Sequence, residues 1–355
     1  MAAKNAVPHT PATGGGQEEP GPTPPQRHRR TRQPPDYRRR AVLGIVGTAA
    51  VSTAFRANIA AERLVTERTQ FRVTTPDNEE NRTAANRFPG KTWYLLGGFD
   101  VSYRDVGRKL AALQPAMNER APASYIGYSN GGIDIAALFI AIQRDTYARN
   151  IDTVYFYGDS FGGMAAVVLA SLLEENGIHI RVLVMGSSPS NVRDVLDPGK
   201  AYISLAGRVV PYLGLVGRLA VGVWSGLANP NGQGMYAAAR SGIDNSLDPA
   251  NNSLILKTSQ ATFLQAFPTQ YDGGIPRSTG IGLMYDPADF IVNARLAIVG
   301  WEQLFPHNPA FVYELPKTGH ASPEIHPDVY RTGLRVVLDK LDPPPLTFKP
   351  VQPIF

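Results

Sequence analysis

The chain of 355 residues has no cysteine. Without a thiol it can form no disulfide scaffold, no cysteine-based zinc site and no cysteine nucleophile. Most of the chain also lacks net charge, because residues 41–355 carry 27 basic and 27 acidic side chains and the whole excess of +5 lies in residues 1–40. A surface without net charge is a poor match to a polyanion, so we expect no nucleic-acid partner for residues 41–355.

Residues 1–40 lack large apolar side chains and contain eight prolines. Such a segment cannot bury enough surface to offset the entropy of ordering, which predicts a disordered tail rich in Pro and Arg. Arg38, Arg39 and Arg40 end this tail, and residues 41–55, which follow it, carry no charge. Basic residues beside an apolar run favour a cytoplasmic position for the basic side.

Several interpretations compete for residues 41–62. A membrane span needs about 20 apolar residues, so the uncharged run at 41–55 is short unless the helix continues past Arg56. A cleaved signal peptide has an apolar core of this length, but an obvious Ala-x-Ala site is missing, and Arg39-Arg40 matches the twin-arginine export signal only loosely. A core helix of a soluble protein is the plain alternative. We favour an uncleaved signal-anchor, which predicts a membrane-anchored or exported protein whose folded part lies outside the cytoplasm.

Short β-type runs and helix-type periodicity alternate after residue 62. This alternation predicts an α/β fold, with βαβ units and a mostly parallel sheet covered by helices on both faces. It stops across residues 189–278, which are rich in Gly, Asn and Pro. We therefore predict a core formed by residues 63–188 and 279–355, interrupted by a helical cap at 189–278. The expected strands cover residues 70–74, 93–96, 124–128, 153–157, 181–185, 281–285 and 310–315, and the expected helices cover residues 106–115, 135–142, 161–176, 292–304 and 327–340.

The run Gly158-Asp159-Ser160-Phe161-Gly162 follows one expected strand and precedes a helix of small and apolar residues. A G-x-S-x-G motif in this setting is typical of a nucleophile elbow, a tight turn that lifts the serine hydroxyl above the edge of the sheet. The turn needs small residues two positions before and after the serine. The N-terminus of the helix and the Phe161 amide then point to the place where an oxyanion would form. The pattern predicts Ser160 as the nucleophile.

A second G-x-S-x-G match at residues 127–131 also lies between an expected strand and an expected helix, so Ser129 is an alternative nucleophile. Chain order favours Ser160. Residues 97–99 (Gly-Gly-Phe) end a strand two βα units before Ser160, whereas Ser129 would leave one unit too few for an oxyanion loop. Without a catalytic role, Ser129 would be a polar turn residue at the same edge of the sheet.

The segment 96–99 (Leu-Gly-Gly-Phe), the elbow at Ser160, then Asp289 and then His320 follow one another in an order that resembles the α/β-hydrolase superfamily. In that family an oxyanion loop follows the third strand, the serine elbow the fifth, an acid the seventh and a histidine the eighth. The resemblance extends from about residue 90 to residue 341, apart from the cap. It implies an α/β-hydrolase fold that carries a Ser-His-Asp triad.

The resemblance also implies the other residues of the site. The backbone amide of Phe99 would be one oxyanion donor and the amide of Phe161 the other. Many members carry a histidine where Gly97 stands, so the contacts behind this loop are expected to differ here. Among the six histidines of the chain, His320 follows the last expected strand at its C-terminal end. Histidine suits proton transfer near neutral pH, so we expect His320 to be the general base.

Two carboxylates after the strand expected at 281–285 are candidates for the acid that orients His320. Asp289 precedes an apolar stretch, as the acid of the family does, and we favour it. Asp286 comes directly off the strand and is the alternative acid, or else a residue that stabilises the turn with Pro287.

The implied reaction is acyl transfer, in which Ser160 attacks a carbonyl while His320 takes its proton, and water later releases the acyl-enzyme. It requires no metal and no organic cofactor. An apolar run at residues 201–228 within the cap favours a small-molecule or lipid-like carboxylic ester as substrate. A peptidase or amidase with the same triad and a non-catalytic binding protein on the same fold are the alternatives.

Overall fold

The computed structural model describes residues 71–129, 131–197, 234–247, 254–267 and 274–343, together with isolated positions within 53–58 and 200–227. The predicted tail at 1–40 lies outside the described residues, and so does nearly all of the predicted signal-anchor at 41–62. Among the residues that the structure describes, no helix combines the length and the apolar character needed to cross a membrane.

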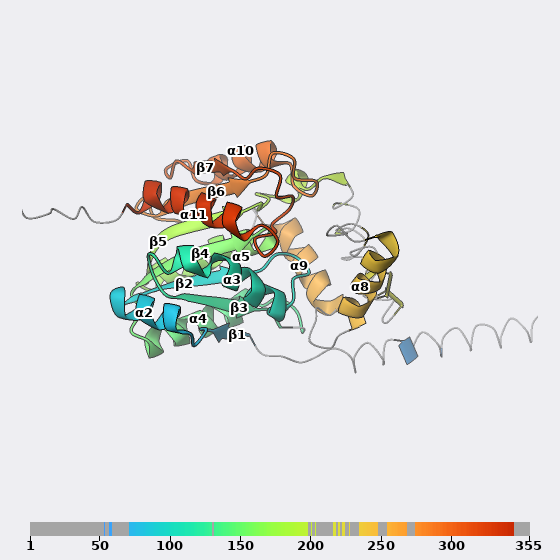
Figure 1. Cartoon of the computed structure of the whole chain (residues 1–355), viewed down its shortest axis with the longest axis horizontal. Helices are drawn as coiled ribbons and strands as arrows, with labels where there is room; N and C mark the ends of the chain where they lie inside the picture. Colours follow the sequence, from blue (N-terminus) through green and yellow to red (C-terminus); the bar gives the residue numbers. More distant parts are fainter. Residues whose placement is uncertain are drawn as a thin grey trace, which may run out of the picture. The chain divides into compact units, whose positions relative to one another are not determined.

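A sheet of seven strands forms the centre of the described chain (Figure 1). The strands are β1 Arg72–Thr74, β2 Lys91–Leu96, β3 Ala123–Gly127, β4 Thr153–Asp159, β5 His179–Gly186, β6 Gly280–Tyr285 and β7 Phe311–Glu314. Their order is β1-β3-β2-β4-β5-β6-β7, and each neighbouring pair is parallel except β1 with β3. The prediction of a mostly parallel sheet is confirmed. Parallel strands present their carboxyl ends at one edge, so the loops after β2, β4, β6 and β7 gather there.

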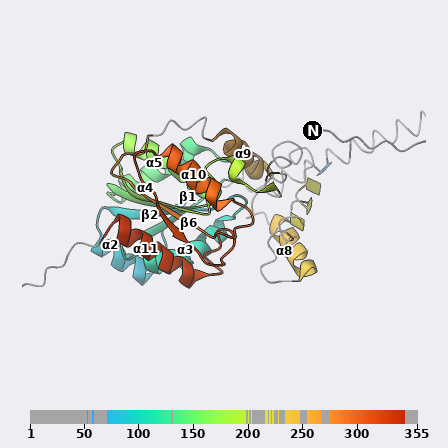
Figure 2. The same ribbon diagram turned by 90° about the horizontal axis from the view of Figure 1, so that it is seen from above.

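Helices cover both faces of the sheet, as the α/β pattern predicts. On one face lie α2 Glu79–Arg87, α3 Tyr103–Met117 and α11 Pro327–Leu341, and on the other lie α4 Ile135–Ala148, α5 Phe161–Glu175 and α10 Ala294–Leu304 (Figure 2). Successive side chains of a strand point to opposite faces. In β4, Tyr155 and Tyr157 therefore join the apolar core under α3 and α11, whereas Val154 and Phe156 join the core under α5.

Two helices differ from the sequence prediction. Periodicity did not predict α2, because it is short and polar, but its start has a local signal, since the Asn78 side chain accepts a hydrogen bond from the Asn81 amide. α3 continues past Pro115, where we expected it to end, as far as Met117. Pro115 lies in the last turn of α3, where its missing N–H removes the hydrogen bond to the Ala111 carbonyl, and only two helical residues follow it.

The predicted cap at 189–278 is described in part. The described elements within it are helical: η1 Val192–Asp194, α8 Met235–Leu247 and α9 Leu254–Ala266. α9 packs against the central domain, because Leu256 and Leu264 of this helix and Phe267 directly after it are buried in the same apolar core as α5. Part of the segment predicted to be a cap thus contributes to the core beside α5.

Candidate active site

Ser160 lies in the tight turn between β4 and α5. Its backbone has φ 48° and ψ −120°, a conformation that residues other than glycine rarely adopt. Two glycines allow this turn. A Cβ atom at Gly158 would lie 2.4 Å from the Gly163 nitrogen, and a Cβ atom at Gly162 would lie 2.4 Å from the Leu96 carbonyl oxygen. Both positions therefore require glycine, as the G-x-S-x-G interpretation expects.

The loop after β2 lies against this turn because β2 and β4 are neighbours, with Leu96 paired to Gly158. A Cβ atom at Gly98 would lie 3.3 Å from the Cβ of Ser160, so the Gly98 backbone approaches the serine closely. Phe99 follows Gly98 in the loop, and Phe161 is the first residue of α5. The two amides expected to hold an oxyanion thus belong to backbone segments that adjoin Ser160.

The structure brings Ser160, His320 and Asp289 together. The Nε2 atom of His320 lies 2.9 Å from the Ser160 hydroxyl, and its Nδ1 atom lies 2.8 Å from a carboxylate oxygen of Asp289. His320 follows β7 in a loop where Gly319 adopts a positive φ of 68°, and Asp289 follows β6. The Asp289 side chain is fully buried and that of His320 is 16% exposed. A carboxylate only accepts hydrogen bonds, so His320 donates from Nδ1 and leaves Nε2 to accept from the serine.

Asp289 is held in its ionised form. Burial raises the pKa of its carboxyl group, but the charge and hydrogen bond of His320, together with the backbone amides of Val292 and Ile291, outweigh burial and place the pKa below its ordinary value. Those amides donate to the second oxygen of Asp289 at 2.8 Å from Ile291 and 3.0 Å from Val292. The carboxylate is therefore fixed by backbone on one side and by the imidazole on the other.

Asp286, the alternative acid, has other partners. One oxygen of this buried carboxylate accepts a hydrogen bond from the Ala288 amide at 2.8 Å, and the other accepts from the Gly319 amide at 2.7 Å. Asp286 thus holds the turn after β6 and ties it to the loop that carries His320, while Asp289 contacts the imidazole itself.

Ser129, the alternative nucleophile, lies after β3, which is separated from β4 by β2. Its hydroxyl accepts a hydrogen bond from the Gly131 amide at 3.0 Å. Its φ is not among the positive values found in the described part of the chain, whereas that of Ser160 is. The structure therefore places Ser129 in a polar turn.

The cap helix α9 reaches the site with both apolar and polar side chains. The Phe263 ring packs edge-on against Phe161, with 5.4 Å between ring centroids. Lys257, which is buried, pairs with Asp100 at 2.8 Å, and the amide of Asp100 donates to the Gln260 side chain at 3.2 Å. Asp100 belongs to the loop after β2, so α9 is linked to this loop by polar contacts that the sequence did not predict.

A buried charge cluster beside the elbow was also missed. The Lys109 ammonium lies 3.0 Å from Asp159 and 3.3 Å from Glu324. A sequence signal exists, because Lys109 occupies the same helical stripe as Val106, Leu110 and Leu113, which are buried. A lysine on an apolar stripe requires a buried anion.

The residues that the structure describes include no group of three or more His, Asp or Glu side chains able to hold a metal ion. The candidate site is formed by the serine, the imidazole, the carboxylate and the surrounding backbone amides.

Strand order, elbow and helical layers define the α/β-hydrolase fold. A scan of protein-family models and a search of curated proteins give no match to the chain. Among solved structures, a candidate aryl esterase from Burkholderia cenocepacia is similar, with 12% identity, a TM-score of 0.51, and coverage of 76% of this chain and 94% of its own. AqdC, solved with the product of its ring cleavage of the Pseudomonas quinolone signal, has 13% identity, a TM-score of 0.52 and coverage of 76% and 96%. A candidate acyltransferase from Salmonella enterica has 12% identity, a TM-score of 0.52 and coverage of 72% and 89%. At these identities the similarity establishes the fold.

Proposed function

We propose that the protein is a serine hydrolase that cleaves a carboxylic ester through an acyl-enzyme. The observation that supports this most directly is a pair of hydrogen bonds that connects the three side chains. The Ser160 hydroxyl lies 2.9 Å from Nε2 of His320, and Nδ1 of His320 lies 2.8 Å from Asp289. These hydrogen bonds begin at a serine held in a strained turn, and strain of this kind concentrates at functional sites.

The proposed reaction follows from the hydrogen-bond directions. Ser160 attacks the carbonyl carbon of the substrate while its proton passes to Nε2 of His320. Asp289 remains ionised and stabilises the imidazolium, in keeping with the lowered pKa of its carboxyl group. His320 then gives the proton to the leaving oxygen, and a water molecule activated by the same nitrogen releases the acid. The proton taken from Ser160 leaves with the alcohol, and a proton from the water passes through His320 to restore the Ser160 hydroxyl.

The negative charge that develops on the carbonyl oxygen needs donors on the side of Ser160 away from His320. In our proposal these are the amides of Phe99 and Phe161. Phe161 opens α5, and the first amides of a helix have no partner within the helix, so the Phe161 amide is free of the helical ladder. Removing one donor of this kind from a serine hydrolase costs about 10²–10³ in kcat.

An ester with an apolar acyl group is the favoured substrate. Phe263 and Phe161 place aromatic surface beside the elbow, and Phe290 and Ile325, both about half exposed, lie in the loops that carry Asp289 and His320. The similar solved structures include a candidate esterase, a ring-cleaving enzyme and a candidate acyltransferase. A peptidase or amidase would use the same triad, and a binding protein without catalysis would retain the fold alone.

The expected site of action is a proposal based on sequence. Arg38 to Arg40 beside the uncharged residues 41–55 favour export or membrane anchoring. Fractionation of cells that express the full chain, combined with protease digestion of intact cells, checks it: recovery of all the protein in the soluble cytoplasmic fraction would contradict the proposal.

A fluorophosphonate probe tests the proposed function on the full chain. We expect wild type to be labelled, Ser160→Ala to lose labelling and Ser129→Ala to retain it. Wild type that stays unlabelled would exclude a serine hydrolase, and labelling that survives Ser160→Ala but not Ser129→Ala would move the nucleophile to Ser129. A panel of p-nitrophenyl esters of increasing acyl length, with the matching anilides, then separates an esterase from an amidase.

A further inference from the structure

Lys109 carries a buried ammonium group beside the candidate active site. It lies on α3, and its side chain is 5% exposed. Three oxygen atoms surround the ammonium: a carboxylate oxygen of Asp159 at 3.0 Å, a carboxylate oxygen of Glu324 at 3.3 Å and the backbone carbonyl of Ala321. Burial lowers the pKa of Lys109, but the charges of Asp159 and Glu324 outweigh burial and raise it, so the group remains a cation.

The three partners of Lys109 belong to the two segments that must meet for catalysis. Asp159 directly precedes Ser160, at the end of β4, and its side chain is fully buried. Ala321 directly follows His320 and adopts a positive φ of 43°, and Glu324 lies further along the same loop. One cation therefore bridges the serine turn and the histidine loop.

The side chains of Ser160 and Asp159 reach different parts of the structure. Strand alternation places Asp159 on the same face as Tyr155 and Tyr157, which is the face that α3 and α11 cover. The serine turn is thus held from the α3 side through Asp159, while the Ser160 hydroxyl contacts His320 at the edge of the sheet. Lys109 touches neither member of this hydrogen bond.

Stability alone is a weak explanation for this cluster. Burying an ammonium and a carboxylate costs several kcal/mol per ion, and replacing a buried pair by apolar residues is often neutral or stabilising. Asp159 shows this cost, because burial raises the pKa of its carboxyl group despite the neighbouring Lys109. A buried pair does, however, fix the relative position of the segments that carry its members.

We propose that Lys109 is a positioning residue that holds the His320 loop in register with the Ser160 turn. This inference rests on the proposed serine-hydrolase function. It predicts that loss of Lys109 lets His320 move relative to the serine, so the chemical step slows while binding of the substrate is retained. A misplacement of about 1 Å is enough for a loss of about 10²-fold in rate.

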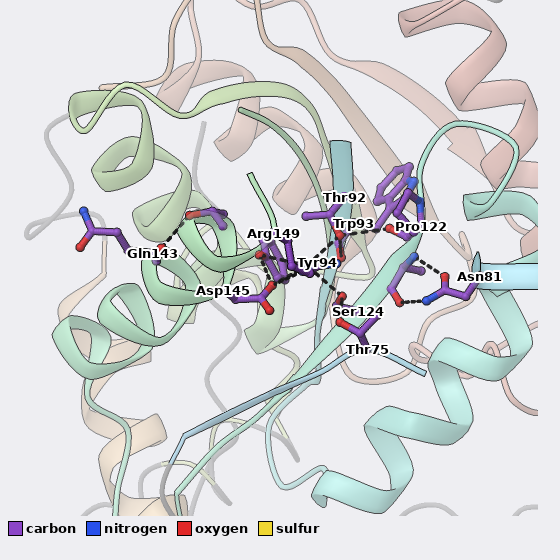
Figure 3. A network of polar contacts seen from close by, with 12 residues as sticks. Thr75, Asn81, Thr92, Trp93, Tyr94, Pro122, Ser124, Gln143, Asp145 and Arg149 are labelled. Carbon is purple, nitrogen blue, oxygen red and sulfur yellow. Dashed lines mark hydrogen bonds and ion pairs between the residues drawn. The ribbon is translucent and has the colours of Figure 1, made fainter. Parts of the chain in front are cut away.

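A matched control exists at the opposite end of β2. Arg149 pairs with Asp145 and donates to Thr92 and Ser124, forming a partly buried charged network near the start of the strands (Figure 3). It ties several elements together as Lys109 does, but it contacts neither the serine turn nor the histidine loop. Arg149→Met therefore measures the cost of breaking a charged network without disturbing the site.

The experiment compares Lys109→Met with Arg149→Met and wild type, as full chains. Three readouts are the fluorophosphonate labelling rate of Ser160, kcat and KM on the best ester, and the melting temperature. We expect Lys109→Met to lose about 10–100-fold in labelling rate and kcat with KM within about twofold. We expect Arg149→Met to lower the melting temperature yet to label at the wild-type rate.

Equal labelling rates for folded Lys109→Met and wild type would overturn the inference, and so would an equal loss of rate in Arg149→Met. If Lys109→Met does not fold, the double variant Lys109→Met/Asp159→Asn decides, because it leaves neither member of the pair charged. Slow labelling of the folded double variant supports positioning, and wild-type labelling refutes it. Wild type that is not labelled at all would contradict the proposed function itself, which separates the two failures.

Discussion

The strained backbone of Ser160 predicts that a glycine at this position makes the protein more stable than an alanine does. Both Ser160→Gly and Ser160→Ala remove the hydroxyl and its hydrogen bond to His320, so that loss cancels between them. They differ in backbone freedom. Alanine must keep φ 48° and ψ −120° with a Cβ atom, whereas glycine adopts this conformation without strain. Both variants should be inactive, so the comparison concerns folding alone.

The magnitude follows from two opposing effects. A non-glycine residue in such a region costs about 1–3 kcal/mol. Glycine relieves that cost but has more conformational freedom to lose on folding, which amounts to about 0.4–1 kcal/mol relative to alanine. The difference is about 0–2.6 kcal/mol in favour of Ser160→Gly. At roughly 2–4 °C per kcal/mol for a domain of this size, a central value near 1 kcal/mol raises the melting temperature by about 3 °C.

Thermal unfolding followed by circular dichroism, together with urea unfolding at 25 °C, measures the difference between the two variants. A melting temperature of Ser160→Gly below that of Ser160→Ala would refute the reasoning, because the strain stored in the turn would then be smaller than the entropy cost of glycine. Gly177→Ala is the positive control, because it tests whether these measurements detect the loss of stability when alanine replaces glycine at a positive φ. Gly177 also has a positive φ, at 79°, but lies at the end of α5 with nothing near its missing Cβ, so alanine should be destabilising there through strain alone.

Three further predictions concern the elbow and the two acids. Gly162→Ala should destabilise the fold by at least about 2 kcal/mol in urea unfolding, because its Cβ would lie 2.4 Å from the Leu96 carbonyl oxygen; unchanged stability would mean that the β2 loop moves freely. Asp289→Asn should lower kcat by about 10³–10⁴-fold, because it removes the carboxylate that His320 contacts. Asp286→Asn should chiefly lower stability, because it weakens the hydrogen bond from the Gly319 amide. The reverse pattern would make Asp286 the acid that orients His320. Because the folded pKa of Asp289 is lowered, its charge stabilises the fold above the unfolded pKa of about 3.9 and loses this effect as pH falls through the folded pKa. The gap in unfolding free energy between wild type and Asp289→Asn should therefore shrink below about pH 4, and a constant gap would contradict the shift.

The parts of the structure that depend on local sequence were predictable. Strand and helix periodicity gave the parallel sheet with covered faces, because buried strands and amphipathic helices leave distinct patterns. The turn at Ser160 was predictable because Gly158 and Gly162 are required by backbone contacts within a few residues of the serine or with the adjacent strand. The order of the motifs along the chain then predicted His320 as the base and either Asp289 or Asp286 as the acid.

Contacts between distant segments were not predictable. Asp286 and Asp289 stand three residues apart, and only the course of the loop decides that one meets the Gly319 amide and the other the imidazole. Lys109 and Glu324 are more than two hundred positions apart, and their pairing depends on α3 and the histidine loop packing on one face. The polar helix α2 was not predicted, because a helical repeat of apolar residues marks only helices with a buried apolar face, and α2 buries few side chains.

Residues 187–279, which include the predicted cap, connect two adjacent parallel strands: they leave the sheet after Gly186 of β5 and re-enter it at Gly280 of β6, which pairs with Val182. The sheet fixes both ends of residues 187–279, at opposite edges because the two strands are parallel, and lengthening a loop tenfold adds only about 2 kcal/mol to the cost of closing it. Burial of Leu256, Leu264 and Phe267 contributes about 1.5–3 kcal/mol each, which more than offsets the closure cost. A segment of different length would therefore join the same two anchor points, Gly186 and Gly280, and leave the strand pairing intact.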